Sequence, residues 1–265
     1  MLKKLLKYDL IYMYKCLIIF YVLSIVCAIC TRIFSNAGEA LIFVIITKIC
    51  NGATIAMMIN ILINNVLRMW ARFSSNLYGD ESYLTHTLPV NKSTLYTSKF
   101  LALVTTILSS GVVIIITLLI AYVDSLKHLK SIINQFVFTD AKVIDVLWVI
   151  CIMLFQFIHI IQLGYTGNIL GNRHLNLRLI WSLVYGFIGY IITQLVILIY
   201  IAILYMVNDN VREVLFTSKG MTMPLPEVEE VLKVLVYGVG VIYIVIIAVV
   251  YIINRKLLSK GVNVD

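Results

Sequence analysis

The chain has 265 residues, of which 62% are hydrophobic and only 13% are charged, and its mean hydropathy is +1.00. This apolar share is far above that of a soluble globular domain and predicts a polytopic membrane protein. The net charge of +8 could suggest nucleic acid, but the basic residues are dispersed between apolar runs and no nucleic-acid motif accompanies them. We therefore expect no nucleic-acid partner.

Residues 1–15 form the first predicted element, an amphipathic helix. Five apolar side chains gather on one side of a helical wheel, opposite three lysines: Leu2, Leu5, Leu6, Leu10 and Met13 against Lys3, Lys4 and Lys7. Such a helix lies at the membrane interface, with its lysines toward anionic lipid. A signal peptide is the alternative interpretation, but residues 28–30 make a poor cleavage site and further apolar spans follow.

Six apolar runs are long enough to cross a hydrocarbon core, which needs about 20 residues per helix. The predicted spans cover residues 16–34, 40–67, 100–123, 143–170, 179–207 and 234–253. They predict an all-α membrane protein that forms a single transmembrane domain. An even number of spans places both termini on one side. Assigning that side to the cytoplasm puts 13 basic residues inside and 7 outside, with Lys48 within the second span. This asymmetry follows the positive-inside rule.

The longest polar interruption, residues 72–99, is then cytoplasmic. Gly79, Asp80 and Glu81 supply a turn and a helix-capping carboxylate. Apolar and hydroxyl side chains follow at helical spacing and predict a short amphipathic helix: Tyr83, Leu84, Thr87 and Leu88. Pro89 ends this helix, and Asn91 with Ser93 can cap a new one that runs into the third span.

Motifs for catalysis, nucleotide binding and metal binding are missing from the sequence. There is no GxxxxGK[ST], HExxH or GxSxG, and the four histidines are far apart. The five cysteines form no CxxC pair, so neither a metal cage nor a disulfide framework is indicated. Asp80 and Glu81 are adjacent, and adjacent side chains on a helix point apart, so we interpret them as capping or solvated carboxylates. We expect no enzymatic activity of this chain alone.

Polar residues inside the spans are the other informative feature. On the fourth span they form one stripe, which must face protein or water: Asp145, Trp148, Gln156, His159 and Gln162. The second span carries Asn60 and Asn64 at i, i+4, with Lys48 and Asn51 nearer its outer end. Two interpretations stay open for these residues. They bond neighbouring helices, at about 1 kcal/mol or less per bond, or they line a translocation path. The candidate path consists of Lys48, Asn51, Asn60, Asn64, Gln156, His159 and Gln162.

Small residues recur at helical spacing on the fourth and fifth spans. They are Gly164, Gly167 and Gly171 on the fourth, and Ser182, Gly186 and Gly189 on the fifth. Such residues let two helix backbones approach closely, so we predict tight packing between these two spans.

Residues 79–99 carry a GlyAspGlu, TyrLeuThr, ThrLeuPro and SerLys pattern. This segment resembles the cytoplasmic segment of permease subunits of type-2 ATP-binding-cassette exporters. The amphipathic start, six spans, charge topology and closing residues 254–265 are similar to that family as well, so the likeness covers essentially the whole chain. One departure is His86, where the family has an apolar residue.

The resemblance implies a dimer of permeases, expected here to be a homodimer, in the bacterial cytoplasmic membrane. Each copy docks on a separate cytoplasmic ATPase through the first cytoplasmic loop, residues 72–99, which acts as a coupling helix. The coupling residues expected in this loop are Gly79, Asp80, Glu81, Tyr83, Leu84, Thr87, Leu88 and Pro89. ATP and Mg belong to that partner, and this chain itself carries no cofactor. Permeases that export phenol-soluble modulins resemble this chain in size, which implies an amphipathic toxin or antimicrobial peptide as substrate. The GluAlaAla loop of importers is not found, so export is favoured.

Three other functions remain open: export of hydrophobic drugs or lipids, peptide immunity or sensing without transport, and an intramembrane enzyme. The family often places short re-entrant helices between its last two spans. Here residues 208–233 are polar and contain Pro224 and Pro226, so the presence of such helices in this chain stays open.

Overall fold

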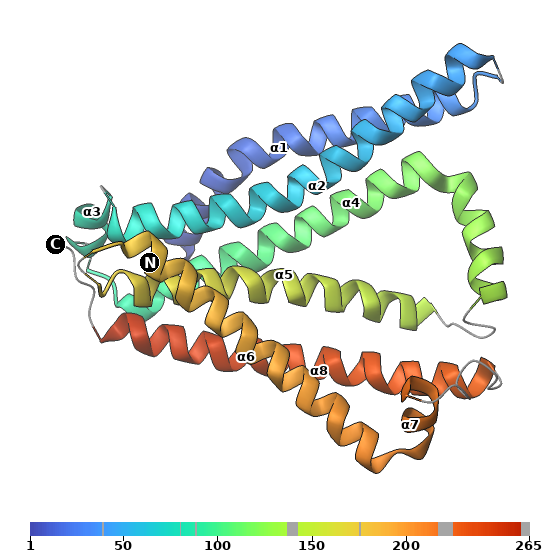
Figure 1. The fold of residues 1–265 in the computed structure, drawn as a ribbon. Coiled ribbons are helices and arrows are strands. Elements are labelled where there is room, and N and C mark those ends of the chain that lie inside the picture. Colours follow the sequence, from blue (N-terminus) through green and yellow to red (C-terminus); the bar gives the residue numbers. More distant parts are fainter. Residues whose placement is uncertain are drawn as a thin grey trace. The chain divides into compact units, whose positions relative to one another are not determined.

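The computed structural model describes residues 1–38, 40–79, 81–87, 89–136, 143–174, 176–216 and 225–260. Within these ranges every regular element is an α-helix (Figure 1). The helices are α1 (Leu2–Ser35), α2 (Leu41–Tyr78), α3 (Ser82–Thr87), α4 (Lys92–Phe136), α5 (Val143–Gly171), α6 (Arg178–Val207), α7 (Asp209–Phe216) and α8 (Leu225–Ser259).

Six of these helices are long and apolar enough to cross a membrane. They include all of α1, α2 and α6, together with Lys92–Tyr122 of α4, Leu147–Gly171 of α5 and Val228–Ser259 of α8. The chain is therefore an all-helical, multi-pass membrane protein, as its composition predicts.

Several helices extend well beyond the predicted spans. Helix α1 is continuous from Leu2 to Ser35, so the expected interfacial segment and the first span form one helix without a break. Helix α2 continues to Tyr78, eleven residues past the predicted end at 67. Gly79 follows as the C-terminal cap, and an added Cβ there would lie 3.0 Å from Ser75 Cα. Hydropathy locates the apolar part of a helix, whereas the turn at Gly79 locates its end.

The chain divides into two compact units. The first contains the described residues of Met1–Lys127 and Arg255–Asp265, and the second those of His128–Asn254. Helix α4 kinks at Tyr122, whose backbone leaves the helical region at φ −126° and ψ 22°.

Hydroxyl groups join the helices of the first unit. Figure 1 shows α1 and α2 side by side, and the Thr31 and Thr54 hydroxyls meet between them at 3.0 Å. On the side toward α4, Tyr21 lies 2.6 Å from Ser110, and Asn65 of α2 donates to the same Ser110 at 2.8 Å. Interhelical hydrogen bonds of this kind matter because lipid supplies no hydrophobic drive for helix association.

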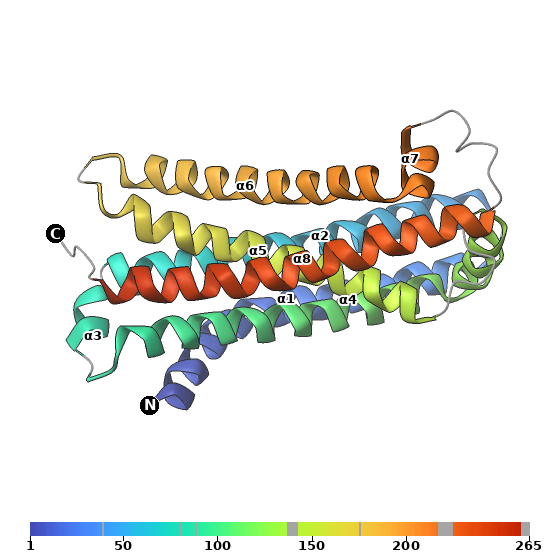
Figure 2. The ribbon, with the colours of Figure 1, turned by 90° about the horizontal axis from the view of Figure 1, so that it is seen from below.

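Glycines bring α5 and α6 together in the second unit. A Cβ at Gly167 would lie 2.2 Å from the backbone oxygen of Ser182, and a Cβ at Gly171 would lie 2.5 Å from the Ser182 nitrogen. Figure 2 shows the two helices approaching at this end. Gly189 is similarly close to the Leu163 side chain. The predicted close packing of the fourth and fifth spans is confirmed.

Candidate functional site

The first unit contains a largely buried cluster of charged side chains at the end where α1 begins and α2 ends. Lys99 of α4 donates to Asp9 of α1, with 2.6 Å between Nζ and Oδ1. Ser98 donates to the other carboxylate oxygen at 3.1 Å. The Asp9 and Lys99 side chains are only 7% and 5% exposed. A buried charge is tolerated only when it is paired and hydrogen-bonded, and this pair meets both conditions.

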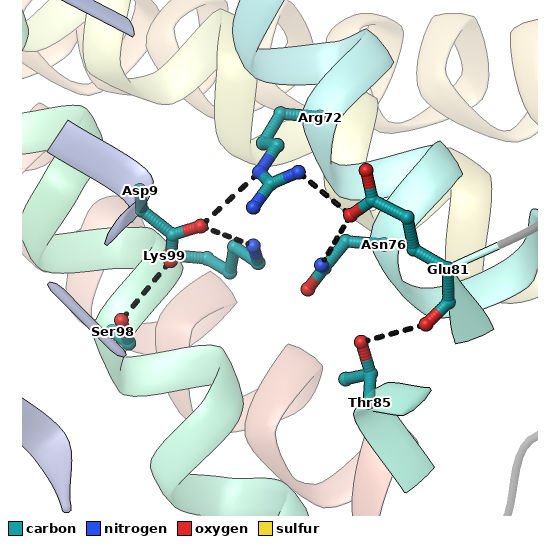
Figure 3. A network of polar contacts seen from close by, with 7 residues as sticks. All are labelled: Asp9, Arg72, Asn76, Glu81, Thr85, Ser98 and Lys99. Carbon is teal, nitrogen blue, oxygen red and sulfur yellow. Dashed lines mark hydrogen bonds and ion pairs between the residues drawn. The ribbon is translucent and has the colours of Figure 1, made fainter. Parts of the chain in front are cut away.

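Arg72 of α2 extends this cluster toward α3 (Figure 3). Its Nε lies 3.4 Å from Asp9 Oδ1, and its Nη1 lies 2.7 Å from Glu81 Oε2. The guanidinium also lies over the Tyr12 ring of α1, 4.6 Å from the centroid. One arginine thus contacts both α1 and the residue that precedes α3. We call Asp9, Arg72, Glu81 and Lys99 the charge cluster; it is formally neutral.

Glu81 has an environment that favours its charged form. Asn76 donates to Glu81 Oε2 at 3.0 Å, and this hydrogen bond is the main reason that the pKa of Glu81 lies below its ordinary value. Partial burial opposes the shift, and the positive charge of Arg72 supports it. The carboxylate therefore bonds to α2, whereas the sequence suggested a cap for the short helix or a solvated group.

A cavity of about 60 Å³ adjoins the charge cluster. Asp9, Arg72, Lys99 and Thr85 contribute to its lining, so it connects the cluster with the inner side of α3. The volume and the polar lining suit a few water molecules.

Helix α3 has one buried and one exposed side. Ser82 and Thr85 are 1% and 6% exposed, whereas Tyr83 and Leu84 are 70% and 73% exposed. The predicted helix, break and restart are present, because α3 ends before Pro89 and α4 begins at Lys92. Asn91 Oδ1 accepts the backbone N–H of Ser93 at 3.2 Å and thereby caps α4, as predicted.

The remaining residues of the expected coupling segment are placed as follows. Gly79 is half-buried at the end of α2, and Thr87 and Pro89 are exposed. Asp80 and Leu88 lie outside the described residues.

Sequence reasoning found α3 but missed the charge cluster around it. Arg72 and Lys99 are two of the 13 basic residues that the charge count places inside, where the sequence pattern indicates only charges that set the topology. A local signal was available, because Asp9 lies four residues from both Leu5 and Met13, on the apolar side of the first helix. A carboxylate on a side that buries Met13 completely requires a buried cation.

The polar residues of the second span differ from one another in their surroundings. Lys48 is exposed, and Asn51 accepts a hydrogen bond from the Tyr122 hydroxyl. Asn60 and Asn64 are half-buried, and their amides donate to backbone oxygens one turn earlier in α2. A second bond to α4, besides that of Asn51, comes from Asn65, which is completely buried and which the pattern did not single out.

The polar stripe of the fourth span faces α6 and α8 within the second unit. His159 is 1% exposed, and its Nε2 lies 2.9 Å from the Thr193 hydroxyl. Gln162 donates to the Ile247 oxygen at 3.3 Å, while Gln156 is half-buried. Near the start of α5, the Tyr237 hydroxyl of α8 donates a hydrogen bond to Asp145 at 2.8 Å. The Tyr237 ring also stacks on Trp148, with 5.4 Å between the ring centroids. These contacts fit interhelical bonding, and a role in translocation stays a prediction.

No group of three or more metal-binding side chains occurs in the part of the chain that the structure describes. The five cysteines are free. No protein-family model, curated protein or solved structure matches the chain.

Proposed function

We propose that this chain is the permease subunit of a bacterial type-2 ATP-binding-cassette exporter. In this proposal both termini and α3 lie in the cytoplasm, and α3 docks on a separate ATPase that binds ATP and Mg. The permease acts as a homodimer in the cytoplasmic membrane. The exposed lysines near the start of α1, Lys3, Lys4 and Lys7, contact anionic lipid.

The observation that carries the proposal is the exposure of Tyr83 and Leu84 on a short helix that is otherwise anchored. A helix that presents large apolar side chains from a fixed position suits a groove on a protein partner. The sequence contains no phosphate-binding loop, so an energy source would have to be on that partner. The resemblance of residues 79–99 to exporter permeases supports the same partner.

The docking surface is tested by the variant Tyr83→Ala/Leu84→Ala in the full chain. We expect this variant to lose ATP hydrolysis that depends on the permease, because truncating a good anchor costs about 1 to 3 kcal/mol of binding free energy. The matched control is Met206→Ala/Val207→Ala, which removes two apolar side chains that are 82% and 78% exposed at the end of α6.

The measurement is ATP hydrolysis by the complex purified with tagged permease and reconstituted in vesicles. The control variant should retain the wild-type rate. Full ATPase stimulation by Tyr83→Ala/Leu84→Ala would exclude this docking surface. Absence of any permease-dependent ATPase would favour the immunity or sensing alternative.

For the substrate, we propose an amphipathic peptide. The candidate path residues offer amides and an imidazole but only one fixed charge, Lys48, which is exposed. A pathway for small ions would be expected to contain rings of charged or carbonyl groups. An amphipathic peptide partitions into the membrane surface by its apolar side, so it can be handled with little recognition of its sequence.

Export of a helical amphipathic peptide is compared with that of a scrambled peptide of equal composition, whose apolar residues are spread evenly around the helix. ATP-dependent export of the first peptide alone is expected. Equal handling of both peptides would favour drug or lipid export instead.

A further inference from the structure

We propose that Arg72 is a positioning residue that fixes α3 relative to α1, so that the start of α1 belongs to the docking machinery. The identity of the partner that α3 binds rests on the proposed function. The positioning of α3 rests only on contacts within the first unit. Arg72 does not contact the proposed partner. It acts through Glu81, the residue immediately before α3.

Helix α3 is too short to hold its own position. It has six residues, and isolated helices below about 12 residues are marginal in water. Its orientation must come from contacts with the rest of the chain. Helix α3 packs against α2, and the Glu81 carboxylate binds Arg72 and Asn76 of that helix. The exposed position of Tyr83 and Leu84 therefore depends on where Arg72 holds Glu81.

Arg72 is held in turn by α1. Its Nε faces Asp9 and its Nη1 faces Glu81, so two edges of one planar group contact two carboxylates (Figure 3). A guanidinium is rigid, and fixing one edge fixes the direction of the other. Asp9 is itself fixed by Lys99 and Ser98 of α4. These contacts together fix the orientation of α3 relative to α2, α1 and α4.

Charge balance links the same groups. Arg72 is 15% exposed and Glu81 is 46% exposed. Without Glu81, two cations of the cluster would share the single carboxylate of Asp9. Movement of α3 away from α2 therefore leaves the cluster with an unbalanced positive charge. A change at Asp9 also weakens the attachment of α3, although Asp9 forms no hydrogen bond with the described side chains of that helix.

The test measures hydrogen exchange of Ser82–Thr87 amides in the full-length protein in lipid nanodiscs, without any ATPase. The first variant is Arg72→Lys, which keeps the charge but cannot present two donor edges. We expect exchange in α3 to rise about tenfold while the unfolding midpoint stays near that of wild type. The matched control is Arg68→Lys, one turn earlier on α2 and without an ion pair among the described residues, which should leave α3 unchanged.

A second variant, Asp9→Asn/Lys99→Met, keeps the formal charge of the cluster and alters no side chain that bonds to α3. A rise in α3 exchange in this variant supports positioning through α1. Wild-type exchange in both test variants would overturn the proposal, as would an equal rise in Arg68→Lys.

If Arg72→Lys fails to fold, Glu81→Gln tests the same link from its exposed end and should also raise α3 exchange. Failure of the proposed function would be seen separately. Exchange in α3 would respond to these variants, but no ATPase would be stimulated by the wild-type chain.

Discussion

The buried pair of Asp9 and Lys99 allows a quantitative prediction of stability. The variant Asp9→Ala leaves Lys99, 5% exposed, without its carboxylate, and Arg72 with Glu81 alone. Breaking a buried ion pair by removing one partner typically costs about 3 to 5 kcal/mol of unfolding free energy. We expect a loss in that range for Asp9→Ala.

An exposed pair in the same chain provides the control. Asp209 and Arg212 of α7 lie 2.8 Å apart, but their side chains are 81% and 50% exposed. Removing an exposed partner costs only about 0.2 to 1 kcal/mol, because water screens the charges. Asp209→Ala should therefore differ from Asp9→Ala by about 2 kcal/mol or more.

The double variant Asp9→Ala/Lys99→Met separates lost pairing from lost packing. If the loss comes from an unpaired buried cation, removing that cation should restore about 2 kcal/mol or more relative to Asp9→Ala alone. The assay is reversible denaturant titration in mixed micelles, followed by tryptophan fluorescence. The reasoning is refuted if Asp9→Ala loses no more unfolding free energy than Asp209→Ala. It is also refuted if the loss in the double variant equals the sum of the losses in the single variants Asp9→Ala and Lys99→Met.

Three further predictions follow from other parts of the chain. Gly167→Leu should destabilise the second unit by about 3 kcal/mol or more, because even a Cβ there would lie 2.2 Å from the Ser182 backbone oxygen; the same titration measures this loss, and a wild-type midpoint would contradict the close contact. Because the folded-state pKa of Glu81 lies below its ordinary 4.5, its carboxylate stabilises α3 above that pH, and α3 protection, corrected for intrinsic exchange, should fall as pH drops through the folded-state value. Protection unchanged from pH 6 to pH 3 would mean that Glu81 does not hold α3. In a cysteine-free background, Ser75→Cys should be labelled only from the cytoplasm and Asn210→Cys only from outside. The opposite labelling would reverse the topology. Asn210 is chosen because Ser218, in the same loop, lies outside the described residues.

The sequence by itself determined the helical class and the six helices that can cross a membrane. Apolar runs of about 20 residues predict membrane helices because backbone groups in lipid must bond within their own segment. Local chemistry also predicted the break at Pro89 and the restart at Asn91, since a proline restricts the residue before it and an asparagine side chain can cap the next turn. The glycines of the fourth and fifth spans predicted close packing, because small residues at helical spacing serve few other purposes in a membrane helix.

Only the tertiary structure decided which polar groups meet. Arg72 lies 63 residues and Lys99 lies 90 residues from Asp9 along the chain, and no local pattern relates them. Local sequence likewise could not indicate that Asn65, rather than its neighbour Asn64, bonds to α4. Adjacent residues of a helix point about 100° apart, so the rotation of each helix about its axis selects between them. That rotation is set by the packing of all neighbouring helices together, which hydropathy along one segment cannot specify.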